Sequence, residues 1–124
     1  MIPMFLATSN KAKRLLHLSY IQHIKPEELK RGLEDMKTLL VDLPPGFRLL
    51  VDLGRLESTD PACTPEIGRI MELLDRSGVG MVVRVIPDSN KDIGLNILSL
   101  FHYPHHPQVV TCKNMAEAIK KLSL

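Results

Sequence analysis

Two nearly continuous apolar segments constrain the fold of this chain more than any other feature. They are Phe47–Leu53 (FRLLVDL) and Val79–Ile86 (VGMVVRVI), and a helix is predicted to begin between them at Thr64-Pro65-Glu66. Such continuous apolar strands are typical of a parallel sheet that is covered on both faces. A hydroxyl residue, a proline and a carboxylate in that order are typical of a helix N-terminus. The sequence therefore predicts a right-handed β-α-β unit.

The other segments extend this unit to a mixed α/β domain. Apolar and polar side chains alternate along Arg14–Ile24, which predicts a half-buried strand. Gly32 lies inside a predicted helix and is expected to mark close packing. On the third helix, the side chains expected to face the core are Ile93, Ile97, Leu98 and Phe101. The further predicted elements are a strand at Ile2–Ala7, helices at Pro26–Asp42 and Asp92–Phe101, a strand at Gln108–Cys112 and a helix from Asn114. We thus expect about five strands, with an antiparallel N-terminal edge followed by parallel strands, and four helices.

Length and charge limit the classes of protein to which the chain can belong. The 124 residues fit a single domain, 1–124. The net charge of +2 creates no strong field, so a nucleic-acid partner is not expected. No apolar run approaches the ~20 residues that a membrane-spanning helix needs. Two cysteines do not form a disulfide framework, and the N-terminus lacks the basic start of a signal peptide, so a cytoplasmic location is expected.

One stretch of the sequence resembles a known family. A strand ending in Val51-Asp52-Leu53 is followed by a turn up to Asp60 and then by a helix, and near the C-terminus Val109-Val110-Thr111 precedes a helix with Ala and Glu. This order resembles the STAS superfamily of bacterial anti-sigma-factor antagonists, in its SpoIIAA-like branch, over roughly Leu15 to Leu122. The resemblance implies a STAS-like fold and a bacterial-type regulatory role.

The same resemblance bears on phosphorylation. Family antagonists carry D-S-[ST]-G at the start of the helix, and the phosphorylated hydroxyl follows the Asp. Asp60 matches that Asp, whereas Ala62 stands at the acceptor position and Cys63 replaces the Gly. On this matching the phosphorylatable Ser or Thr is absent, and any partner binding is expected to be constitutive, or controlled by a ligand or by the abundance of the protein.

A binding face is expected at the carboxyl ends of the parallel strands, where ligands bind in open α/β sheets. The loops 54–64, 87–91 and 113–114 are predicted to meet there, and helix N-termini favour an anion or a partner's carboxylate. The Thr64 hydroxyl is expected to cap the helix that Pro65 starts. The candidate binding residues are Arg55, Ser58, Thr59, Asp60, Cys63, Thr64, Glu66 and Lys91.

No set of residues indicates a catalytic site, a metal site or a cofactor. Cys63 precedes a helix N-terminus, where the pKa of a thiol can fall, so thiol chemistry is the enzymatic alternative. His102, His105 and His106 lack the spacing of a zinc site and are expected in a solvated loop.

Two functions remain open. One is a regulatory or scaffold module that binds a protein partner. The other is a domain that binds a small anion, nucleotide or lipid at the carboxyl ends of the strands. An exposed N-terminal edge makes a homodimer possible.

Overall fold

The computed structural model describes residues 3–87 and 89–124, and in the third helix it describes side chains from 94 onward. Within these residues a five-stranded sheet has the order β1-β2-β3-β4-β5, with β1 antiparallel to β2 and the other pairs parallel. This confirms the predicted mixed α/β fold. The elements are β1 (Phe5–Asn10), β2 (Leu15–Ile24), α1 (Pro26–Leu40), β3 (Arg48–Thr59), η1 (Pro61–Cys63), α2 (Thr64–Arg76), β4 (Met81–Val85), α3 (Ser89–His102), β5 (Gln108–Cys112) and α4 (Met115–Lys121).

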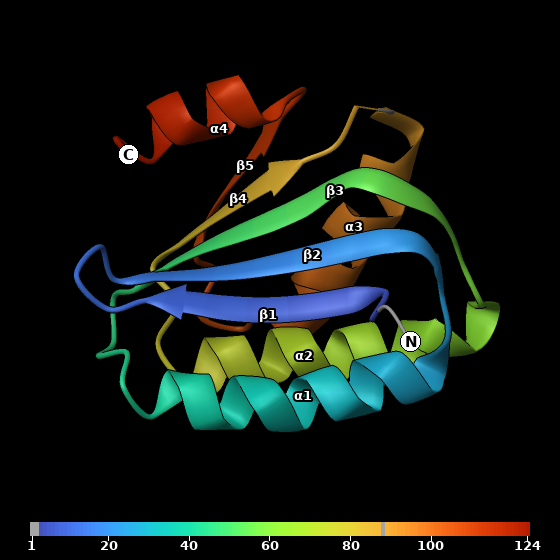
Figure 1. The fold of residues 1–124 in the computed structure, drawn as a ribbon, viewed down its shortest axis with the longest axis horizontal. Helices are drawn as coiled ribbons and strands as arrows, with labels where there is room; N and C mark the ends of the chain where they lie inside the picture. Colours follow the sequence, from blue (N-terminus) through green and yellow to red (C-terminus); the bar gives the residue numbers. More distant parts are fainter. Residues whose placement is uncertain (1–2, 88) are drawn as a thin grey trace.

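The sheet separates two hydrophobic clusters of unequal size. The helices α1, α2 and α3 lie on one face of the sheet and α4 on the other (Figure 1). Strand residues such as Leu18 and Leu49 point to the face that carries α1, α2 and α3, where they form the larger cluster. Leu50 and Val83 point to the opposite face, which α4 covers with Ala118. Period-two alternation explains this division, because successive side chains of a strand lie on opposite faces.

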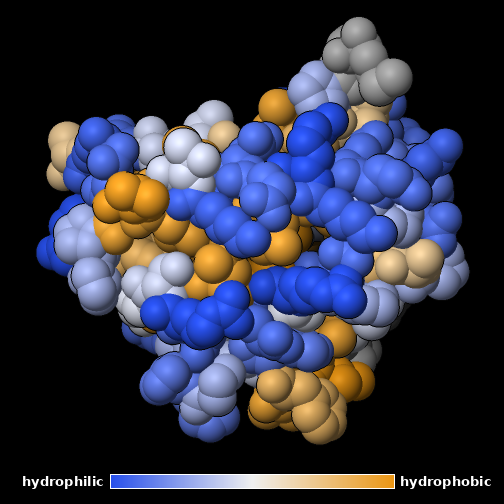
Figure 2. Space-filling model, turned by 90° about the horizontal axis from the view of Figure 1, so that it is seen from below, coloured by the Kyte–Doolittle hydropathy of each residue, from blue (hydrophilic) through white to orange (hydrophobic). Residues whose placement is uncertain are grey.

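The helices α1 and α2, which pack on the larger cluster, are amphipathic. Seen from the side of α1 and α2, hydrophilic side chains cover most of the surface, and hydrophobic side chains show between them (Figure 2). The inner face of α1 buries Leu29 and Met36 completely. None of the helices within the described residues is both long and apolar enough to cross a bilayer.

The close packing predicted at Gly32 is confirmed. A Cβ atom at Gly32 would lie 2.2 Å from two ring carbons of Phe5, so only a glycine lets α1 approach β1 this closely. The Phe5 ring in turn packs edge-on against Tyr20, with 5.0 Å between the ring centroids and an angle of 83° between the ring planes.

The predicted end of β3 is wrong. The sequence placed it at Leu53 and a loop after it, but β3 runs to Thr59 and stays paired with β2 as far as Ile24. Two register shifts in β2, between Ser19 and Ile21 and between Gln22 and His23, let the two strands remain paired. Residues 54–59 therefore belong to the strand and pair with β2. The polar composition of this segment is typical of a loop, so the sequence did not reveal that pairing.

The predicted inner face of α3 is only partly correct. Leu98 packs against the larger cluster as expected, and the side chain of Ile93 lies outside the described residues. Ile97 and Phe101 are 52% and 76% exposed, and Leu100 beside them is 70% exposed. The reason is Arg84 on β4, which donates to the side chain of Asn96 at 2.8 Å and to the hydroxyl of Ser99. A buried guanidinium needs polar acceptors, so α3 turns its Asn and Ser toward the sheet.

Candidate functional site

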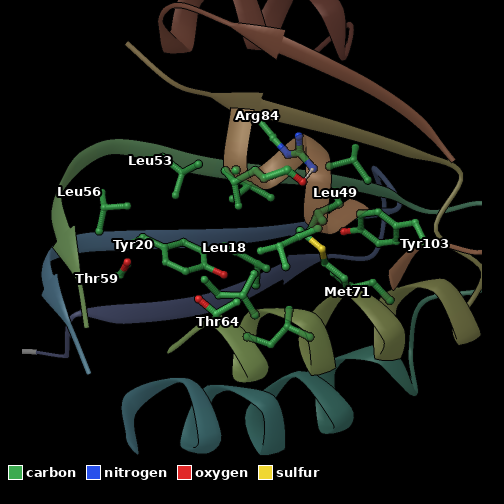
Figure 3. A pocket seen from close by; sticks show the side chains of 18 of the residues that line it. Leu18, Tyr20, Leu49, Leu53, Leu56, Thr59, Thr64, Met71, Arg84 and Tyr103 are labelled. Atoms are coloured by element: carbon green, nitrogen blue, oxygen red, sulfur yellow. Dashed lines mark hydrogen bonds between the residues drawn. The ribbon is translucent and has the colours of Figure 1, made fainter. Parts of the chain in front are cut away.

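A cavity of about 460 Å³ lies between the sheet and the helices α2 and α3. Its walls are mostly aliphatic, and Ile67 of α2 is one of the lining residues. Leu18, Leu49 and Leu53 line it from the strands and Met71 lines it from α2 (Figure 3). The volume falls in the range of small-molecule sites, ~300–1,000 Å³, which are typically apolar with a few well-placed polar groups. This cavity, called the sheet–helix pocket below, is the candidate functional site.

Three large polar side chains contribute to the walls of the sheet–helix pocket. They are Tyr20 from β2, Arg84 from β4 and Tyr103, which directly follows α3, and they are 6%, 2% and 3% exposed. The hydroxyl groups of Tyr20 and Tyr103 point toward the interior of the pocket from different sides, and Arg84 reaches in from the sheet (Figure 3). The pocket therefore combines an apolar wall with hydrogen-bonding groups that belong to almost completely buried residues.

Both tyrosines are neutral phenols at physiological pH. Burial raises the pKa of Tyr20 far above its usual range, Tyr103 and Cys63 raise it further, and Arg84 opposes this. Burial likewise raises the pKa of Tyr103, again against the effect of Arg84. Among the residues whose side chains are described, neither phenol hydroxyl has a hydrogen-bond partner. Each hydroxyl is thus available to a molecule inside the pocket.

The opening of the pocket lies near the end of β3 and the start of α2. Ser58 and Thr64 line the pocket and are exposed, and Ile97 on α3 contributes its half-exposed side chain. In Figure 3, Leu56 and Thr59 lie on one side of the pocket and Tyr103 on the other. The pocket thus runs from a partly polar mouth to an interior that contains Tyr103.

The structure brings only part of the predicted binding face to the surface. Arg55, Ser58 and Thr64 are exposed, whereas Cys63 and Glu66 are 0% and 6% exposed. Glu66 forms an ion pair with Arg69 on the same helix. Thr59 and Asp60 are half-buried, and the side chain of Lys91 lies outside the described residues. Cys63 and Glu66 therefore cannot contact a partner directly, and the role of the other residues stays a prediction.

The expected capping role of Thr64 is wrong. Thr64 already has helical backbone angles, and the N-cap of α2 is Cys63, which makes no side-chain capping bond. Asp60 caps the preceding η1 turn instead, because its carboxylate accepts the N–H of Ala62 at 2.9 Å. The 3₁₀ turn in front of α2 moves the capping position back to Asp60.

The thiol of Cys63 does not have the properties of a nucleophile. Burial and the nearby carboxylate of Asp60 raise its pKa, and its S–H donates to the carbonyl of Ile24 at 3.4 Å. Burial also raises the pKa of Cys112. Reactive cysteines have lowered pKa values and are partly exposed, so these two thiols are structural.

Two of the three histidines in the predicted solvated loop are paired. His102 donates to Glu72 at 2.7 Å, and His105 donates to Asp75 at 2.5 Å through Nδ1 and at 3.1 Å through its backbone N–H. These pairs attach the end of α3 and the connection that follows it to α2. Tyr103, which lies between the two histidines, lines the pocket, so the pairs also hold one side of the pocket in place. In the part of the chain that the structure describes, no group of three metal-ligating side chains forms.

Comparison with known proteins relates the fold to solved structures. No family model matches the chain, and no curated protein matches it in sequence. An uncharacterised DUF3478-family protein from Shewanella loihica PV-4, described as having a SpoIIAA-like fold, superposes with a TM-score of 0.73 at 10% identity, over 95% of this chain and 91% of that one. The unphosphorylated anti-sigma factor antagonist SpoIIAA superposes with a TM-score of 0.64 at 12% identity, over 96% and 97% of the two chains.

This chain has a SpoIIAA-like fold. The STAS-like architecture expected from the strand ending in Val51-Asp52-Leu53 and the helix after it is confirmed. At these identities the similarity is one of fold, so the function must be argued from the residues of this chain.

Sequence reasoning missed the polar residues of the sheet–helix pocket, although one signal was present. Arg84 interrupts the apolar run of β4, which was itself expected to be covered on both faces. A charged residue is almost never fully buried without polar partners, so its position predicts a polar site under the sheet. Tyr20 and Tyr103 carried no comparable signal, because tyrosine is common at the edge of an ordinary core.

Proposed function

We propose that the protein is a non-enzymatic binding module that holds a small, largely apolar molecule in the sheet–helix pocket. The observation that carries this proposal is the cavity of about 460 Å³, whose walls are aliphatic except for a few buried polar groups. The ligand site expected from the sequence was placed outside the strand ends. The mouth at Ser58 and Thr64 lies in that region, but the body of the pocket is beneath the sheet.

Binding of a protein partner is a second candidate function, in keeping with a STAS-type regulatory role. It is favoured by the exposure of Arg55, Ser58 and Thr64 at one end of the molecule and by the similarity in fold to an anti-sigma factor antagonist. Ala62 offers no hydroxyl at the expected acceptor position. Because Ser58 and Thr64 belong both to this surface and to the mouth of the pocket, a bound ligand would alter what a partner contacts. Ligand binding, in place of phosphorylation, then regulates the interaction with the partner.

The same proposal includes a cytoplasmic, bacterial-type setting and one functional domain over 1–124. A homodimer through the outer edge of β1 is compatible with it, since an open edge can pair with a second chain.

The pocket proposal is tested with an apolar fluorescent dye, N-phenylnaphthylamine, and two tryptophan variants of α3. Leu98 lines the pocket, and Leu100 is exposed on the same helix outside it. Leu98→Trp fills the pocket and should abolish dye binding, whereas Leu100→Trp should bind the dye as the wild type does. Because the chain contains no Trp, each variant also reports its own folding by fluorescence. Absence of dye binding to the wild type, or equal binding by both variants, would contradict the proposal.

A further inference from the structure

The hydroxyl groups of Tyr20 and Tyr103 limit the chemical class of ligand that the sheet–helix pocket can bind. Both side chains are more than nine-tenths buried, both hydroxyls point into the sheet–helix pocket, and neither has a partner among the described side chains (Figure 3). Neither hydroxyl oxygen is among the buried side-chain atoms without a partner, so each is accessible from the pocket and still lacks a hydrogen-bond partner such as water or a ligand. A molecule in the pocket can supply that partner to both tyrosines.

The polar groups inside the pocket favour an acceptor on the ligand. A protonated phenol donates one hydrogen bond, and the guanidinium of Arg84 can only donate. Burial keeps both phenols protonated, since it raises the pKa of each. Arg84 also carries a positive charge at a site where it is 2% exposed, and charge-assisted hydrogen bonds to a carboxylate are about twice as strong as neutral ones.

The positions of the lining residues give the orientation of the ligand. Arg84 and Tyr103 are almost completely buried, whereas the exposed residues of the described lining are Ser58, Thr64, Gly94 and Ile97. The rest of the wall is almost entirely aliphatic. A polar head can therefore bind inside while an apolar chain extends along the wall to the mouth.

We infer, building on the proposed function, that the ligand is a medium-chain carboxylate or a close amphipathic relative with an oxygen-acceptor head. It binds head first, with its head between the hydroxyls of Tyr20 and Tyr103 and beside Arg84. Its apolar chain follows the aliphatic wall toward Ile97 at the mouth.

The head group is tested by displacement of N-phenylnaphthylamine with compounds that share one chain length. Decanoate should displace the dye, and decylamine, whose cationic head only donates, should require at least tenfold more. Methyl decanoate keeps the carbonyl and lacks the charge, and it should fall between the two. Equal displacement by decanoate and decylamine would overturn the inference, and displacement by methyl decanoate at lower concentration than decanoate would overturn the carboxylate head.

Two conservative variants assign the head to the tyrosines. Tyr20→Phe and Tyr103→Phe remove a hydroxyl that has no described protein partner, so the melting temperature should not change. The dissociation constant for the dye is measured for each variant, so that displacement can be converted to an affinity for decanoate. The dissociation constant for decanoate should rise about fivefold in each variant, as expected for the loss of one hydrogen bond. Arg84 is a less suitable target because it also bonds α3 through Asn96.

The outcomes separate this inference from the function on which it rests. If the wild type does not bind the dye at all, the proposed pocket function fails. If the dye binds but decanoate has the same affinity for the wild type and for both phenylalanine variants, the pocket stands and the assigned head group is wrong.

Discussion

At the scale of single residues, Gly32 controls how closely α1 approaches β1. Gly32→Ala would place a methyl carbon 2.2 Å from the ring of Phe5, and that ring cannot move freely because it packs against Tyr20. Overpacking of this kind typically costs ~1–3 kcal/mol. We expect the free energy of unfolding, measured in urea, to fall by that amount, although alanine is the better helix former.

Gly94 on α3 provides the matched control. No heavy atom of the described residues lies within 4 Å of a Cβ placed there, so Gly94→Ala gains helix propensity without a clash. It should raise the free energy of unfolding by up to ~1 kcal/mol. A loss of stability at Gly94, or none at Gly32, would show that the two glycines are not distinguished by their packing.

The residues between Ser58 and Thr64 also decide whether the chain can be a phosphorylation switch. Ser58 Oγ lies 2.6 Å from Nδ1 of His23, Thr59 is half-buried, and Ala62 has no hydroxyl. A phosphate in this segment would also lie near Asp60, and like charges repel. We expect no mass increase after incubation with native lysate and ATP. One stoichiometric phosphate within 58–64 on intact-mass analysis would restore the switch.

At the scale of elements, the sequence correctly predicted the order and type of the helices and strands. It was less successful in predicting where a strand ends and which face of a helix is buried. The alternation along Arg14–Ile24 correctly predicted a half-buried strand, with Leu16 and Leu18 on its buried face. These features depend on local periodicity. The end of β3 and the inner face of α3 depend instead on contacts with β2 and Arg84, which lie elsewhere in the chain.

In the sheet–helix pocket, too, some features depend on local periodicity and others on contacts between distant parts of the chain. Its aliphatic wall consists of residues already expected in the core, such as Leu49 and Leu74. What the sequence did not predict is that these residues leave a cavity, because a cavity arises from the spacing between α2, α3 and the sheet. Periodicity predicts which side a residue faces and carries no information on that spacing.

Hydrogen bonds between Asp75 on α2 and His105, in the connection from α3 to β5, lead to a prediction about how these elements are held together. Asp75 is 5% exposed and accepts two hydrogen bonds from His105. Asp75→Asn replaces a buried charged acceptor by an amide and should lower the free energy of unfolding by ~1–3 kcal/mol in urea at neutral pH. Asp42→Asn is the control, since Asp42 forms an exposed ion pair with Lys11 at 3.2 Å, and should change stability by less than ~1 kcal/mol. Equal effects of the two variants would refute the role given to His105.

At the scale of the whole molecule, the unequal covering of the sheet explains where a ligand site can form. The face over β4 and β5 carries α4 with a compact cluster around Val83 and Ala118. The other face carries three helices, and α3 turns polar residues toward Arg84 instead of filling the space with Ile97 and Phe101. The buried arginine and the cavity are thus connected: the orientation of α3 that satisfies Arg84 directs bulky apolar side chains outward.

The buried phenols and thiols make the stability of the whole domain sensitive to alkali. The pKa values of Tyr20, Tyr103, Cys63 and Cys112 are all raised in the folded chain. The unfolded chain therefore loses these protons first as pH increases, and stability falls. The cysteine contribution should begin near the ordinary thiol value of about 8.5 and the tyrosine contribution near about 10. In urea titrations over this range, the free energy of unfolding of the double variant Tyr20→Phe/Tyr103→Phe should still decline where the cysteines titrate. Its decline where the tyrosines titrate should be shallower than that of the wild type. Since lysine titration affects both proteins alike, parallel curves above about pH 10 would show that the two phenols do not oppose ionisation in the folded state.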